Sequence, residues 1–69
     1  MRKIVYTKHA KQRILERDIS EQEIKTVLEF PDYTISYENK KKSIKRIHDR
    51  EITVIFADKN DYIIIITVY

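Results

Sequence analysis

The sequence contains no cysteine and no glycine, and its 69 residues include one proline and two histidines. The absence of cysteine excludes disulfides, zinc sites built on thiolates and a cysteine nucleophile. The absence of glycine excludes a glycine-rich phosphate-binding loop and a G-x-S-x-G nucleophile elbow. The longest apolar run, residues 62–66, is far shorter than the roughly 18 residues of a membrane span, and the basic N-terminus lacks a secretory apolar segment. We therefore expect a cytoplasmic protein that does not enter a membrane.

The length of the chain predicts one domain, residues 1–69, with a small core. A chain of this size exposes much of its surface, so its core is marginal without further support. Disulfides are excluded, and two histidines make a poor basis for a structural metal site, so oligomerisation is the remaining support. We expect a homodimer with neither metal nor cofactor. The content of isoleucine, lysine and glutamate is also typical of thermophile proteins.

The charged residues form blocks of alternating sign. Residues 1–17 hold six basic residues and one acid, residues 18–39 hold six acids and one lysine, and residues 40–50 again hold six basic residues and one acid. If the basic blocks meet in the folded protein, they form a surface that attracts polyanions such as RNA. The residues that we expect to bind RNA are Lys8, Lys41, Lys42, Lys45, Arg46 and Arg50.

Two short helices are predicted near the N-terminus, after a strand at residues 2–6. Thr7 is placed to cap a helix over residues 8–17, which contain good helix formers and no glycine or proline. Asp18 and Ile19 break that pattern. Ser20 and Glu23 then have the spacing of a capping box, and Pro31 ends the second helix.

Four strands are predicted after Pro31, over residues 33–37, 42–48, 51–57 and 62–69, with short turns between them. The first of them alternates Tyr33, Ile35 and Tyr37 with polar residues, which predicts a half-buried strand. The predicted fold is α+β, β-α-α-β-β-β-β, with the two N-terminal helices on one face of a four- to five-stranded, mainly antiparallel sheet. The last two strands are apolar on both faces, which leaves an apolar face for a second copy or another chain. The alternative is a small groove that stays exposed.

His9, Arg13 and Arg17 lie four residues apart, which stacks them along one side of the first helix. On a helical wheel this row borders the apolar side that Ala10 and Ile14 form, at about 100° per residue. The row then either extends into solvent from the edge of the apolar side or lines a groove between helix and sheet. Glu16 follows Arg13 at a spacing that allows the first of these, by neutralising the arginine.

The remaining side chains able to carry chemistry are histidine, arginine, lysine and tyrosine. His48 follows Arg46 in a predicted strand, and Tyr6, Thr67 and Tyr69 offer hydroxyl groups. This set suits cleavage of RNA through its own 2′-OH. That reaction needs a base for the hydroxyl, an acid for the leaving oxygen and cations for the charge that develops on the phosphate.

The same residues resemble the motifs of a known family. The chain carries His9-Ala10-x-x-Arg13-x-x-x-Arg17, followed by an Ile-Ser capping turn, and closes on a Thr-x-Tyr strand ending at Tyr69. This arrangement resembles the small prokaryotic family called domain of unknown function 4258 over nearly the whole chain. Asp18 stands where members usually have glycine.

The resemblance implies a fold similar to that of the RelE-type toxins of toxin–antitoxin systems, many of which are ribonucleases, ribosome-dependent or free. It implies a site formed by His9, Arg13, Arg17, Thr67 and Tyr69. It also implies RNA as substrate, including mRNA on the ribosome, and an antitoxin protein as partner.

Three functions follow as hypotheses. The first is a RelE-like, metal-independent endoribonuclease, with His9 as base or acid, Arg13 and Arg17 on the phosphate, and His48, Arg46 and Tyr69 assisting. The second is a non-catalytic module that binds RNA or a protein. The third is a dimeric structural protein whose charges only keep an aggregation-prone sheet in solution.

Overall fold

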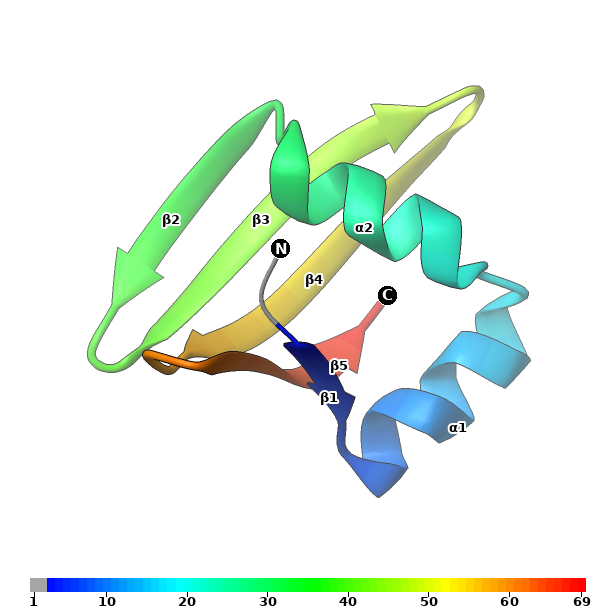
Figure 1. The fold of residues 1–69 in the computed structure, drawn as a ribbon. Helices are drawn as coiled ribbons and strands as arrows, with labels where there is room; N and C mark the ends of the chain where they lie inside the picture. Colours follow the sequence, from blue (N-terminus) through cyan, green and yellow to red (C-terminus); the bar gives the residue numbers. More distant parts are fainter. Residues whose placement is uncertain (1–2) are drawn as a thin grey trace.

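The computed structural model describes residues 3–69, so Arg2 of the first predicted strand lies outside the described residues. The order of the elements confirms the predicted β-α-α-β-β-β-β arrangement and the α+β class (Figure 1). The elements are β1 (Lys3–Tyr6), α1 (Lys8–Arg17), α2 (Glu21–Glu29), β2 (Tyr33–Tyr37), β3 (Lys40–Ile47), β4 (Arg50–Asp58) and β5 (Tyr62–Val68).

The strands form one five-stranded sheet in the order β1-β5-β4-β3-β2. Strands β2 to β5 follow one another as antiparallel neighbours, because short turns suffice to connect them. Strand β1 instead pairs in parallel with β5, so the first and last strands lie side by side, with Lys3 next to Tyr62. A parallel pair needs a long crossover connection, and the helices together with β2, β3 and β4 supply it.

Local sequence explains where both helices begin. The hydroxyl of Thr7 accepts a hydrogen bond of 3.0 Å from the amide of Ala10, and it donates one of 2.9 Å to the carbonyl of Ile66. Thr7 therefore caps α1 and also holds its first turn against β5. Helix α2 begins with the predicted capping box, in which Ser20 and Glu23 satisfy each other's backbone amides at 3.1 and 2.9 Å.

The turns between strands are tighter than the sequence predicts. Lys40 and Lys41, predicted in a turn, belong to β3, and His48, predicted at the end of that strand, lies in the next turn instead. The backbones of Glu38 and His48 adopt positive φ angles of 52° and 58°. One such residue in each turn lets the chain reverse without glycine, so the strands on both sides extend further.

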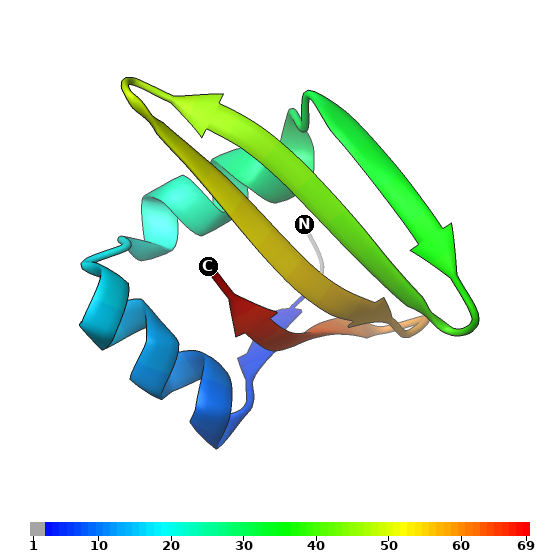
Figure 2. The same ribbon diagram turned by 180° about the vertical axis from the view of Figure 1, so that it is seen from behind.

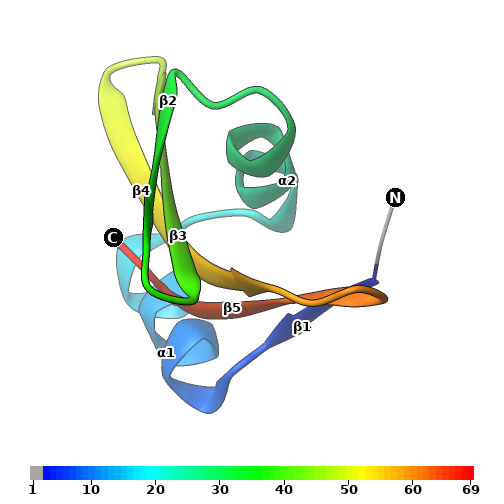
Figure 3. The same ribbon diagram turned by 90° about the vertical axis from the view of Figure 1, so that its left-hand side faces the viewer.

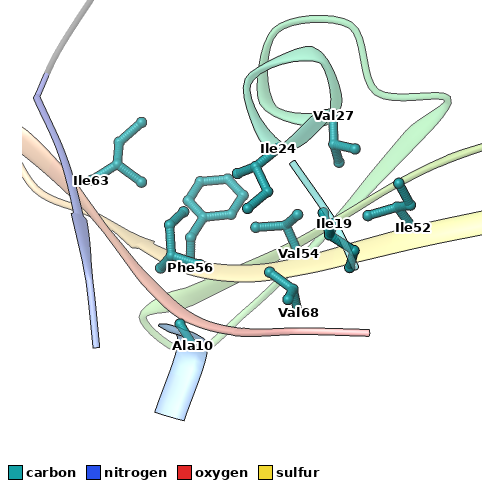
Figure 4. Packing of buried hydrophobic residues seen from close by; sticks show 10 residues of the cluster. Ala10, Ile19, Ile24, Val27, Ile52, Val54, Phe56, Ile63 and Val68 are labelled. Carbon is teal, nitrogen blue, oxygen red and sulfur yellow. The ribbon is translucent and has the colours of Figure 1, made fainter. Parts of the chain in front are cut away.

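The core lies between the sheet and the helices. Side chains from both helices meet side chains from β4 and β5 in one hydrophobic cluster, with the segment between the helices contributing as well (Figure 4). The buried members are Ala10, Ile19, Ile24, Val27, Ile52, Val54, Phe56, Ile63, Ile65 and Val68.

The face of β2, β3 and β4 that is turned away from α2 has no helix in front of it (Figures 2 and 3). We call this surface, together with the end of β5 that continues it, the open face. All five residues of β2 are exposed, so the prediction of a half-buried strand was wrong. The strand lies at the edge of the sheet, where neither a further strand nor a helix covers its side chains.

Candidate nucleic-acid interface

Strand β3 separates the second basic block into two groups. Residues that pair across neighbouring strands point to the same face of a sheet. Lys41 pairs with Phe56 and Lys45 with Ile52, and both partners belong to the core, so these lysines leave the sheet on the helix side. The residues that alternate with them, Lys40, Lys42 and Arg46, therefore lie on the open face.

The two lysines on the helix side are engaged with carboxylates. The Nζ atom of Lys41 lies 3.6 Å from Asp58, and that of Lys45 lies 3.6 Å from Asp32. The pKa of Asp32 is lowered, first by a hydrogen bond of 2.9 Å from the backbone amide of Arg46 and further by Lys45. Both lysines thus neutralise charge within the protein.

Arg50 is engaged in a similar way, at the junction of the two helices. One nitrogen of its guanidinium group, Nη1, donates 2.8 Å to the carbonyl of Arg17. The other, Nη2, donates 3.1 Å to the carbonyl of Asp18 and 3.2 Å to the carboxylate of Glu23. The pKa of Glu23 is lowered, first by the backbone amide of Ser20 and further by Arg50. Arg50 therefore fastens the start of β4 to the corner between α1 and α2.

The open face carries tyrosines arranged around Lys42. Tyr33 pairs with Ile44 and Ile44 with Thr53, and Thr53 exchanges backbone hydrogen bonds of 2.7 and 2.9 Å with Tyr69. These four residues form a row across four neighbouring chain segments. The next row along the strands contains Lys42, whose partners are Ile35, Ile55 and, through Ile55, Thr67.

Three tyrosines of this face expose a large part of their surface, 52% for Tyr33, 40% for Tyr37 and 42% for Tyr69. Ile44 and Thr53, in contrast, are buried although they belong to the same face. Since no helix covers them, the larger side chains around them must provide their cover. On the open face, the exposed rings of three tyrosines therefore lie around the buried side chains of Ile44 and Thr53.

Lys42 interacts with these rings. Its Nζ atom lies 5.8 Å from the ring centroid of Tyr69, within the range of a cation–π contact. The pKa of Lys42 is raised, first by a hydrogen bond to Tyr69 and then by the electrostatic effect of Tyr69, Tyr37 and Tyr33. Lys42 therefore places a positive charge beside the Tyr69 ring, in register with Ile35 between Tyr33 and Tyr37. Lys40 and Arg46 add two more, and Glu51, opposite Arg46, is the acid that the pairing places on the same face.

The cationic row on α1 lies elsewhere. His9 and Arg17 are exposed, and Arg13 is half-buried with its Nη1 atom 3.7 Å from Glu16, the pairing that the sequence allowed. Lys8 is exposed at the start of the helix. A pocket between α1 and β1 has none of these residues in its lining, which is formed by Tyr6, Lys11, Ile14, Leu15 and Glu21. Burial raises the pKa of the Tyr6 hydroxyl in this pocket, and Glu21 adds to the effect.

The two histidines are not brought together. His48 lies in the turn two residues before Arg50, which contacts the last residue of α1, whereas His9 lies in the first turn of that helix. A helix of ten residues is about 15 Å long. Among residues 3–69, no hydrogen bond or ion pair joins the side chains of His9, Arg13 or Arg17 to Tyr69 or His48.

The exposure of Tyr33 and Tyr37 on the open face was not predicted, because their alternation with polar residues indicated a half-buried strand. The available signal was the alternation of two tyrosines and Ile35 in a strand followed directly by a lysine-rich strand, because a hairpin places alternate residues of both strands on one face.

Two further findings concern metal ions and membranes. Within residues 3–69, no group of three or more histidine, aspartate or glutamate side chains is placed to hold a metal ion. In the same part of the chain, no helix has the length and apolar character that crossing a membrane requires.

Comparison with known proteins gives one result. No curated protein and no solved structure matches this sequence. Residues 6–69 match a family whose description is "Domain of unknown function (DUF4258)", and this region contains both helices and strands β2 to β5. The predicted resemblance to this family is thereby confirmed over nearly the whole chain, and the chain belongs to the DUF4258 family.

Proposed function

We propose that the protein binds RNA on the open face of its sheet, with backbone phosphates at Lys40, Lys42 and Arg46. The observation that carries this proposal is the separation of the basic block by strand β3. Lys41 and Lys45 have carboxylate partners on the helix side, whereas Lys40, Lys42 and Arg46 share the open face with Glu51 as the acid that the pairing places there. This face therefore keeps a net positive charge for an external anion.

A polyanion gains from this arrangement by releasing its counterions. Each phosphate neutralised on a single strand contributes about −0.7 to the slope of log affinity against log salt concentration. Three cations on the open face thus correspond to a slope of about −2. The open face also offers the hydroxyls of Thr67 and the exposed tyrosines, which can bond to phosphate or sugar oxygens.

The test measures binding of a fluorescently labelled RNA by anisotropy between about 50 and 200 mM salt. Lys42→Gln and Arg46→Gln, singly and together, are expected to weaken binding and to flatten the slope of log affinity against log salt concentration by about 0.7 per cation. Lys45→Gln, which removes the same charge from the same strand on the other face, is the matched control and should have a smaller effect. Equal effects of Lys42→Gln and Lys45→Gln would contradict the assignment to the open face.

A second candidate function is cleavage of the bound RNA by a RelE-like, metal-independent reaction. It is favoured by the exposed imidazole of His9, one turn from Arg13 and two turns from Arg17 on α1. One group takes the proton of the 2′-OH, the 2′ oxygen attacks the phosphorus, and the 5′ oxygen leaves with a proton from an acid. The products are a 2′,3′-cyclic phosphate and a 5′-OH. In this hypothesis His9 is base or acid, Arg13 and Arg17 bind the phosphate, and Arg46 and Tyr69 assist, whereas His48 lies in the turn beside Arg50 and is not brought to His9.

Incubation of the protein with ribosome-free RNA and with translating ribosomes, in the presence of a chelator, tests this candidate. His9→Ala is expected to abolish the cyclic-phosphate product while leaving RNA binding and the melting temperature nearly unchanged. Lys11→Ala, on another side of the same helix, is the control. Undiminished cleavage by His9→Ala would exclude the proposed role of His9. A RelE-like toxin also predicts growth arrest on expression and rescue by an antitoxin.

A further inference from the structure

We propose that the open face selects single-stranded nucleic acid, whose unpaired bases stack on Tyr33, Tyr37 and Tyr69 while the backbone contacts Lys42. This inference rests on the proposed function, because it names the class of nucleic acid that the same face accepts.

The three tyrosines are spaced so that one strand of nucleic acid can reach all of them. Tyr33 and Tyr37 lie four residues apart on β2, which corresponds to about 13 Å along a strand. Tyr33 and Tyr69 end the same row, three strand spacings apart, which corresponds to about 14 Å. Lys42 pairs with Ile35, between Tyr33 and Tyr37 on β2, and its Nζ atom lies 5.8 Å from the centroid of the Tyr69 ring. A chain of nucleotides that crosses this area meets aromatic rings at separated points and a cation at the centre.

The rings of the three tyrosines are exposed enough to stack on bases. Each of the three tyrosines leaves at least 40% of its surface in contact with solvent, and Ile35 between them leaves 46%. An aromatic ring gains from covering its free face with another flat apolar surface, and every base offers such a surface when it is unpaired. In a duplex the base faces are stacked on one another, so only phosphates and groove edges reach a protein surface. The tyrosines therefore add affinity for a single strand and little for a duplex.

Charge decides between a nucleic acid and a second copy of the chain. In a symmetric dimer the open face would lie against an identical face. The face that carries Lys40, Lys42, Arg46 and Glu51, with its net positive charge, would then meet a face of the same net charge on the partner. Like charges brought together in an interface disfavour association. The same cations attract a single strand, which supplies the negative charge that the face lacks.

The experiment compares the wild-type protein and its variants on four oligonucleotides of one sequence: single-stranded RNA, single-stranded DNA and the corresponding duplexes. The wild type is expected to bind the single strands more tightly than the duplexes. Tyr33→Leu, Tyr37→Leu and Tyr69→Leu should each weaken single-strand binding about 5- to 150-fold, from the range of base–aromatic stacking. The matching phenylalanine variants should bind nearly as tightly as the wild type. The fluorescence of 2-aminopurine placed in the single strand should decrease on binding, because the base stacks on a tyrosine ring.

The outcomes separate this inference from the proposed function. The stacking role would be overturned if the wild type bound single strand and duplex equally and the leucine variants bound as the wild type does. If Lys42→Gln still weakened binding in that case, the proposed RNA binding would stand. If the wild-type protein bound none of the four oligonucleotides, both the stacking role and the proposed RNA binding would be overturned. Equal affinity for the RNA and DNA single strands supports stacking, because both carry the same base faces. If sedimentation shows a wild-type dimer that the leucine variants convert to monomers, the face is occupied by a second copy and the inference is overturned.

Discussion

Replacement of Arg50 by lysine separates a structural role from an RNA-binding role, because it keeps the charge and removes the planar group. The guanidinium group donates hydrogen bonds of 2.8 and 3.1 Å to the carbonyls of Arg17 and Asp18, and one of 3.2 Å to the carboxylate of Glu23. A lysine ammonium cannot address acceptors in this fixed geometry. We expect the variant to keep a contact with Glu23 and to lose those with the carbonyls.

The size of the effect follows from the number and exposure of these bonds. A hydrogen bond contributes about 0.5–1.5 kcal/mol net, and an exposed ion pair about 0.2–1 kcal/mol. Arg50 is exposed, so each of the two lost bonds is taken at the lower half of its range, which gives a destabilisation of about 1–2 kcal/mol. For a domain of this size, that lowers the melting temperature by about 4–16 °C.

Thermal unfolding followed by circular dichroism measures the change, and RNA anisotropy on the same samples measures binding. Arg50→Lys should unfold at a lower temperature and, where folded, bind RNA as the wild type does. Arg46→Lys is the matched control, because the side chain of Arg46 donates one long hydrogen bond, 3.5 Å to the carbonyl of Asp49. An unchanged melting temperature for Arg50→Lys would refute the fastening role. A loss of RNA affinity as large as that of Lys42→Gln would place Arg50 in the interface instead.

Three further predictions concern stability. Asp18→Gly should stabilise the protein by about 0.5–1 kcal/mol in urea unfolding, because residue 18 ends α1 with φ 53° and ψ 51°, a conformation that glycine adopts without steric cost; a less stable variant would contradict this. Ile65→Ala, at a fully buried position of the core, should cost about 2–5 kcal/mol, whereas Ile35→Ala on the open face should cost far less in the same assay. Glu23 and Asp32 have folded pKa values below their ordinary values of 4.5 and 3.8, so their stabilisation is present above these values and is lost as the pH falls through the folded pKa. Melting temperatures measured from pH 7 to pH 3 should therefore fall below about pH 4.5, and Glu23→Gln should reduce that fall; a flat profile would contradict the prediction.

The helices were predictable because the signals that define them are local. Thr7, Ser20, Glu23 and Pro31 act within a few residues of the helix ends that they determine, so their sequence spacing is sufficient. The boundaries of β3 were less predictable. Residues 39–41 are polar, which favours a turn, yet a single residue with positive φ at Glu38 closes that turn and allows Lys40 and Lys41 to pair with β2.

The candidate site was predictable in its residue types and only partly in its location. The basic block at residues 40–50 was predicted to bind RNA, and the strand pairing separates its lysines between a face with carboxylate partners and the open face. The prediction that the last two strands leave an apolar face for a partner stays a prediction. The homodimer that the sequence suggested stays a prediction, and the sedimentation experiment above tests it.

The amino-acid sequence by itself determined the order of the elements, both helices with their caps, the membership of the family and the blocks of charge, since each depends on neighbours along the chain. Only the tertiary structure decided which residues share a surface. The pairing of β1 with β5, the separation of Lys41 and Lys45 from Lys42 and Arg46, and the row from Tyr33 to Tyr69 depend on contacts between distant segments. A shift of one residue in strand register would exchange the two faces of β3, and the burial of Ile52, Val54 and Phe56 against the helices prevents that shift. The hydrophobic core thus places Lys42 among the tyrosines.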